Sequence, residues 1–153
     1  MAFEFEVEIE LKSNAEKLWS ALKEHVTIFP KAAPDKYDIV EVLEGDGLSV
    51  GSVVLFKKTE TNGSSRMTQR IELVDEAKKT LIYSVIGGDI MKYYKTYKSI
   101  TRVMSTDHDR RALAKCAVVY EKAVEHVPDP DLLKTFIVEL FHQIDAYLLS
   151  SSA

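Results

Sequence analysis

The stretch from residue 37 to residue 122 constrains the fold most, because its pattern predicts one β-strand after another. Apolar and β-branched segments recur near 37–43, 52–60, 65–74, 79–86, 93–104 and 112–122. The turns between them are Gly45–Gly51, Asn62–Gly63, Glu76–Lys78, Gly87–Asp89 and Thr106–Asp109. Asn-Gly is a strong hairpin signal, and such short connections favour antiparallel pairing over crossover units. We therefore predict an antiparallel meander.

The N-terminal residues add a seventh strand. Apolar residues occupy the odd positions from Phe3 to Leu11, and glutamates occupy the even positions from Glu4 to Glu10. This period of two is typical of a strand with one buried face and one solvated face.

Two short helices are predicted between this strand and the next. Ser13 and Glu16 have the spacing of a capping box, in which each side chain accepts a free backbone N–H. The apolar residues that follow recur at helical spacing. Pro30 and Pro34 confine a second helix to a short piece within 27–34.

The C-terminal segment predicts one long helix. Asp129-Pro130-Asp131 supplies an N-cap, a proline at the first helical position and a carboxylate near the positive helix end. The helix extends to about Leu149, and its apolar residues cover close to half of its circumference. Such an arc suits a helix enclosed by a curved sheet. We predict an α+β fold: a seven-stranded curved antiparallel sheet around this helix, with two short helices between strands 1 and 2.

Length and composition limit the classes of function. The chain has 153 residues, which we take as a single domain, 1–153. Twenty Lys and Arg against twenty-four Asp and Glu give a net charge of −4, so no nucleic-acid partner is expected. The N-terminal alternation is no signal peptide, and no stretch approaches the roughly 20 apolar residues of a membrane span. We expect a soluble, cytoplasmic protein.

The sequence gives little support for a metal site or a disulfide. Cys116 is the only cysteine, which excludes an internal disulfide and leaves no thiolate set for zinc. The four histidines show no ligand spacing with Cys116, and we expect them at the surface or at a cavity rim: His25, His108, His126 and His142. No metal and no cofactor are predicted.

Strand alternation predicts the inward-facing side chains. On the three clearest strands they are Met67, Gln69, Ile71 and Leu73, then Tyr97, Ser99, Thr101 and Val103, then Ala114, Cys116, Val118 and Tyr120. Phe56, Leu81, Tyr83 and Val85 come from strands that are apolar on both faces. Hydroxyl, amide and small groups in this set are unusual for a dry core. An apolar pocket with a few placed polar groups is what a small-molecule site requires.

Several motifs resemble one plant family. They are Phe29–Pro34 (FPKAAP), Glu44–Gly51, Tyr83–Asp89 (YSVIGGD) and Ala146–Leu149 (AYLL). In this order they are similar to the birch-pollen-allergen, or pathogenesis-related class 10, superfamily. Met91–Lys95 (MKYYK) and Tyr120–Lys122 (YEK) resemble its major latex protein branch.

The resemblance implies a helix-grip fold and a role in plant defence. Most members are cytosolic carriers that bind hormones, sterols, flavonoids or alkaloids in a hydrophobic cavity, and a few are cofactor-independent enzymes. The loop Gly45–Gly51 departs from the shorter, glycine-rich family loop. It also lacks the Gly-Lys-Ser/Thr ending of a phosphate-binding loop, which favours a structural hairpin.

Our leading hypothesis is a protein that binds, sequesters or transports one hydrophobic or amphipathic plant metabolite in an internal cavity. We expect a monomer, with weak dimerisation left open. The predicted cavity walls are Leu22, Phe29, Phe56, Met67, Gln69, Leu81, Tyr83, Val85, Tyr97, Ser99, Cys116, Phe136, Ile137 and Leu140. Gln69, Tyr83 and Ser99 would orient the ligand through hydrogen bonds.

Two alternatives remain. The first is an isomerase or C–C bond-forming lyase in which Tyr97, Tyr83 and Lys115 move protons. The resemblance implies a cavity position for Lys115, as in the condensing enzymes of the superfamily, whereas strand alternation places it on the solvated face, which we favour. The second is an interaction protein that acts through its surface.

Overall fold

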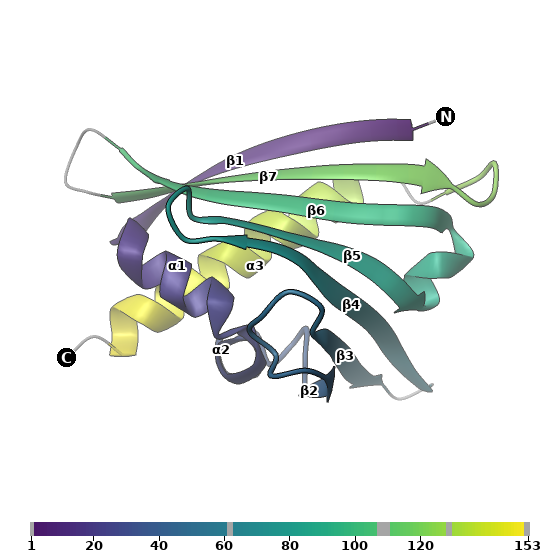
Figure 1. Ribbon diagram of the computed structural model, residues 1–153, viewed down its shortest axis with the longest axis horizontal. Helices are drawn as coiled ribbons and strands as arrows, with labels where there is room; N and C mark the ends of the chain where they lie inside the picture. Colours follow the sequence, from purple (N-terminus) through teal and green to yellow (C-terminus); the bar gives the residue numbers. More distant parts are fainter. Residues whose placement is uncertain (1, 61–62, 107–110, 128–129, 152–153) are drawn as a thin grey trace.

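The structure is a computed structural model that describes residues 2–60, 63–106, 111–127 and 130–151. Within these residues the elements follow the predicted order (Figure 1). They are β1 (Ala2–Asn14), α1 (Ala15–Lys23), α2 (His25–Ala32), β2 (Ile39–Glu44), β3 (Val53–Glu60), β4 (Gly63–Asp75), β5 (Thr80–Gly88), the 3-10 helix η1 (Asp89–Lys92), β6 (Tyr94–Ser105), β7 (Arg111–Lys122) and α3 (Pro130–Ser151). The predicted turn residues Asn62 and 107–109 and the predicted cap Asp129 lie outside the described residues.

The strands of the described ranges form one seven-stranded antiparallel sheet in the order β1-β7-β6-β5-β4-β3-β2. β2 to β7 are neighbours in sequence order, as the short turns predicted, and β1 pairs with β7 so that Val7 lies opposite Cys116. The strands curve over α3, and α1 and α2 lie at one end of the sheet (Figure 1). The predicted α+β architecture is confirmed.

A buried carboxylate attaches α3 to the end of β1. Asp145 accepts hydrogen bonds from the backbone N–H of Lys12 at 3.0 Å and of Ser13 at 2.9 Å. Burial by itself raises the pKa of Asp145, but the hydrogen bonds from Ser13 and Lys12 outweigh it and lower that pKa. Ile144 beside it is fully buried. The helix is therefore held to β1 by two hydrogen bonds to a charged group as well as by apolar packing.

The N-terminus of α1 is capped by a different residue than predicted. β1 continues to Asn14, so Ser13 lies within the strand and the capping box with Glu16 does not form. Instead, the side-chain oxygen of Asn14 accepts a hydrogen bond from the backbone N–H of Lys17 at 2.8 Å. Asparagine serves this role as well as serine does.

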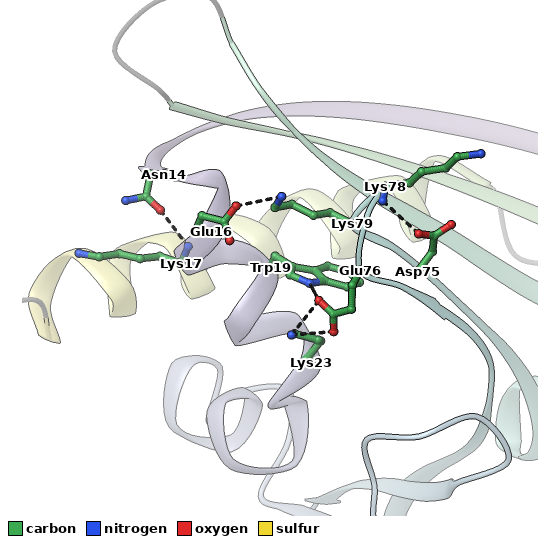
Figure 2. A network of polar contacts seen from close by, with 9 residues as sticks. All are labelled: Asn14, Glu16, Lys17, Trp19, Lys23, Asp75, Glu76, Lys78 and Lys79. Carbon is green, nitrogen blue, oxygen red and sulfur yellow. Dashed lines mark hydrogen bonds and ion pairs between the residues drawn. The ribbon is translucent and has the colours of Figure 1, made fainter.

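Charged contacts join α1 to the turn between β4 and β5 (Figure 2). Glu76 in this turn accepts hydrogen bonds from Nε1 of Trp19 at 2.8 Å and from Nζ of Lys23 at 2.9 Å. Nζ of Lys79 forms an ion pair with Glu16 at 2.9 Å. These contacts set the position of α1 at the end of the sheet.

Two further details differ from the sequence-based expectations. α2 begins at His25, earlier than predicted, and contains Pro30, although it ends before Pro34. On β4 the register shifts between Ile71 and Leu73, and this bulge turns Leu73 outward although alternation predicts it inside. The bounds of short helices and the positions of bulges depend on tertiary packing, which strand periodicity does not reveal.

Candidate functional site

Two adjoining chambers lie between the concave face of the sheet and the helices α2 and α3. The inner chamber has a volume of about 60 Å³ and the outer chamber about 280 Å³. The residues that line both are Phe29, Phe56, Gln69, Tyr83, Ile137 and Leu140. The two chambers therefore adjoin at these six residues.

The inner chamber is mostly apolar and includes a histidine that the sequence reasoning misplaced. Leu22, Leu81 and Cys116, which are among the predicted cavity walls, line this chamber. His25 also lines it and is only 6% exposed, so the expectation of a surface or rim position was wrong for this histidine. Its Nδ1 lies 3.1 Å from the carbonyl oxygen of Leu22.

Burial favours the neutral form of His25. Desolvation lowers its pKa below the ordinary 6.5, although hydrogen bonding to the backbone at Leu22 and Lys23 opposes this. The imidazole stacks on Phe56 with 5.9 Å between ring centroids and meets Phe29 edge-on at 6.0 Å. His25 thus acts as an aromatic wall residue with one polar edge.

The outer chamber combines apolar walls with phenol and hydroxyl groups. Predicted residues Met67, Tyr97 and Ser99 line it from the sheet, and Phe136 lines it from α3. Phe136 is 39% exposed, which places it at the edge of the chamber rather than in its interior. Tyr37, between α2 and β2, also lines this chamber.

Charged residues surround the outer chamber, and several of them are engaged with the protein. Nζ of Lys36 forms ion pairs with Asp35 at 3.3 Å and Glu139 at 3.2 Å. Nζ of Lys58 donates a hydrogen bond to the carbonyl oxygen of Pro34 at 3.0 Å. These lysines therefore give the chamber no strong preference for an anion.

The structure brings together every predicted cavity residue except Val85. Val85 is buried but lines neither chamber. It pairs with Gln69 beside a shift in the β4–β5 register. The longer Gln69 side chain lines both chambers, whereas Val85 packs into the core.

A polar cluster lies on the wall formed by β5, β6 and β7. Oγ of Ser99 and Oγ1 of Thr101 each lie 3.6 Å from Sγ of Cys116. Burial raises the pKa of the Cys116 thiol, so it stays protonated and is a poor nucleophile. Burial also raises the pKa of Tyr83 to about 12, although the Ser99 and Gln69 side chains next to its hydroxyl lower it slightly.

Lys115 lies away from both chambers. Its side chain is 41% exposed, and its Nζ forms an ion pair with Glu8 of β1 at 3.3 Å. The strand alternation thus gave the correct side, and the cavity position implied by the resemblance is not observed.

Sequence reasoning missed His25 and Tyr37 as lining residues. Tyr37 falls in the predicted strand 37–43, but β2 begins only at Ile39, and Tyr37 reaches the chamber because its ring packs on Phe29 and Phe56. The only available signal was the presence of an aromatic residue three positions after Pro34. Within the described residues, no three His, Cys, Asp or Glu side chains are grouped to hold a metal ion. No helix in those ranges is long and apolar enough to cross a membrane.

The comparisons with known proteins agree with this geometry. The family model described as "Pathogenesis-related protein Bet v 1 family" matches residues 1–151. MLP-like protein 423 of Arabidopsis thaliana is 40% identical over 148 residues, covering 96% of this chain and 94% of that protein. Allergen Pet c 1 of Petroselinum crispum is 32% identical over 145 residues, covering 90% and 92%.

A solved structure shows the same fold. The crystal structure of ginseng major latex-like protein 151 from Panax ginseng superposes with a TM-score of 0.85 at 21% identity, covering 97% of this chain and 98% of that one. The resemblance to the major latex proteins and the helix-grip fold that it implied are thereby confirmed. The chain belongs to the Bet v 1 family of pathogenesis-related proteins, and within it to the major latex protein branch.

Proposed function

We propose that this protein binds one hydrophobic or amphipathic plant metabolite in its two chambers and sequesters or transports it in the cytoplasm. The observation that carries the proposal is the pair of chambers between the sheet and α3, which leaves space where a core would be filled. Aromatic and aliphatic side chains supply contact area, and the polar cluster at Tyr83, Ser99 and Gln69 supplies orientation.

The chamber volumes favour a compact ligand. Pockets for drug-sized molecules measure about 300–1,000 Å³, and the outer chamber, at about 280 Å³, lies just below this range. A flavonoid, hormone or alkaloid of two or three rings suits it. A sterol would require the shared side chains, such as Phe29 and Leu140, to move and join the chambers.

Titration with the neutral dye N-phenyl-1-naphthylamine tests the proposal. We expect saturable binding of about one dye per chain, with displacement by one chemical class of metabolite. Leu140→Asp should abolish binding, because Leu140 lines both chambers and a carboxylate there would be desolvated.

Leu132→Asp is the matched control. Leu132 lies on the same helix but is among the exposed apolar residues, so this variant should bind the dye normally. A folded wild-type protein that binds no dye, or a folded Leu140→Asp variant of unchanged affinity, would refute the proposal.

The alternative of a cofactor-independent isomerase or lyase receives less support. Lys115 lies on the outer face, and burial raises the pKa of Tyr97 and of Tyr83, so both phenols stay protonated near neutral pH. They could act as acids but not as bases there.

A further inference from the structure

Two tyrosines that line the outer chamber are buried as residues, but their hydroxyls have no hydrogen-bond partner among the described residues. Tyr37 is 7% exposed and Tyr97 is 8% exposed, and both line the outer chamber. Among the described residues, neither hydroxyl has a hydrogen-bond partner in the protein. Neither oxygen is among the fully buried polar atoms that lack a partner, so both hydroxyls open onto the chamber, where a bound molecule can pair with them.

Aromatic contacts fix both rings. Tyr37 stacks on Phe29 at 6.1 Å, lies against Phe56 at 5.3 Å and meets Phe136 edge-on at 6.3 Å. Tyr97 meets Tyr94 edge-on at 5.7 Å. Because the rings are held in place, their hydroxyls point in set directions before any ligand arrives, which reduces the entropy lost on binding.

The chemistry of these groups is that of hydrogen-bond donors. Burial raises the pKa of Tyr37 and of Tyr97, and the neighbouring Tyr83 raises both further, so the phenols keep their protons near neutral pH. A ligand that satisfies them must offer an acceptor. The lysines Lys36 and Lys58 are already engaged with Glu139 and with the Pro34 carbonyl. The third cation of the lining, Arg66, is exposed, and its backbone N–H binds the carboxylate of Asp89, which also lines the chamber, so a charged acceptor gains little there.

Resting on the proposed function, we infer that Tyr37 and Tyr97 form a pair of donors that selects an apolar ligand carrying a neutral oxygen acceptor, such as a ketone, ester or ether. The apolar body of this ligand lies against Met67, Ile137 and Leu140, and its oxygen lies at the two phenols. A hydrocarbon of the same shape leaves both hydroxyls unpaired and binds more weakly.

A matched pair of ligands tests this selection. 2-Acetylnaphthalene and 2-isopropylnaphthalene have nearly the same shape, and only the first carries a carbonyl oxygen. Their dissociation constants are measured by displacement of N-phenyl-1-naphthylamine from the wild-type protein, Tyr37→Phe and Tyr97→Phe. Comparing the ratio of the two constants between wild type and variant removes the difference in hydration of the ligands.

Each substitution should weaken binding of the ketone relative to the hydrocarbon by about threefold to tenfold, the effect of losing one hydrogen bond. Tyr120→Phe is the control, because Tyr120 is equally buried but lines neither chamber, and its ratio should equal that of the wild type. Neither chamber variant should unfold, since each removes a hydroxyl with no partner among the described residues. A wild-type ratio in both Tyr37→Phe and Tyr97→Phe overturns the inference.

Infrared spectroscopy of the wild-type complex gives a second readout that needs no variant. With ¹³C in the carbonyl of 2-acetylnaphthalene, donation by the phenols should shift the C=O band to lower frequency than in cyclohexane. An unshifted band overturns the inference, while normal dye binding in the same sample leaves the proposed function standing. If neither the dye nor the ketone binds to the folded protein, both are overturned.

Discussion

Replacing Asp145 should reveal how strongly α3 is attached to the sheet. Its two carboxylate oxygens accept the N–H groups of Lys12 and Ser13, and the residue is buried. A hydrogen bond to a charged group contributes about 1.5–3 kcal/mol, and a neutral one about 0.5–1.5 kcal/mol. In Asp145→Asn one oxygen remains as a neutral acceptor, while the amide NH₂ faces the other N–H and leaves it unpaired.

We therefore expect Asp145→Asn to lower the free energy of unfolding by about 2–4 kcal/mol, a large share of the roughly 5–15 kcal/mol of a domain. Urea denaturation followed by circular dichroism measures this as a midpoint lowered by about 1–2 M. Asp131→Asn is the control, since Asp131 is on the same helix and its side chain is 80% exposed beside Lys134, and it should change stability by less than about 1 kcal/mol.

The pH dependence of the stability difference between wild type and Asp145→Asn gives a second test. Because the folded pKa of Asp145 lies below its ordinary 3.8, its contribution is complete above that value and is lost as the pH falls through the folded pKa. The difference between wild type and Asp145→Asn should therefore shrink under acid conditions. An Asn variant as stable as the wild type at pH 7 would show that the carboxylate does not hold α3.

Three further predictions concern other parts of the molecule. The folded pKa of His25 is lowered below 6.5, so its contribution to stability is present above pH 6.5 and is lost as the pH falls. Denaturation curves between pH 7 and pH 5 should show a steeper loss of unfolding free energy for the wild type than for His25→Gln. Equal slopes would contradict the burial of His25 in its neutral form. Gly88 has φ +106°, and a Cβ there would overlap the carbonyl oxygen of Arg66. Gly88→Ala should therefore lower the free energy of unfolding by about 2–4 kcal/mol in a urea titration. An unchanged midpoint would contradict a tight contact between β4 and β5. Lys115→Ala should bind N-phenyl-1-naphthylamine with wild-type affinity, and a weaker affinity would mean that this residue reaches the cavity.

Most of the sheet could be predicted from the sequence because strand alternation is a local signal. Tyr97, Ser99 and Thr101 on β6 are all buried as predicted, since the strand is regular through these positions. Leu73 is exposed because one bulge reverses the alternation after Ile71. A single inserted residue changes no local pattern that could reveal it in advance.

The site was less predictable where it depends on elements without a strand period. Helix α2 begins at His25, and this start turns the imidazole into the inner chamber. Tyr37 lies outside any helix or strand and is placed by its contacts with Phe29 and Phe56. Such positions follow from tertiary packing alone, so periodicity could not predict them.

The hollow itself has a physical cause that bears on function. Ser99 and Cys116 place small side chains at the centre of the curved wall, while the rings of Phe29, Tyr37 and Phe56 pack on one another at its edge and cannot collapse inward. At about 24 cal/mol per Å³, leaving even the 60 Å³ inner chamber unfilled costs about 1.4 kcal/mol. A larger aliphatic residue in place of Cys116 would fill that space without introducing a charge or a turn. Stability alone therefore gives no reason for the small residue, whereas a binding function does, because functional sites are where optimal packing is given up.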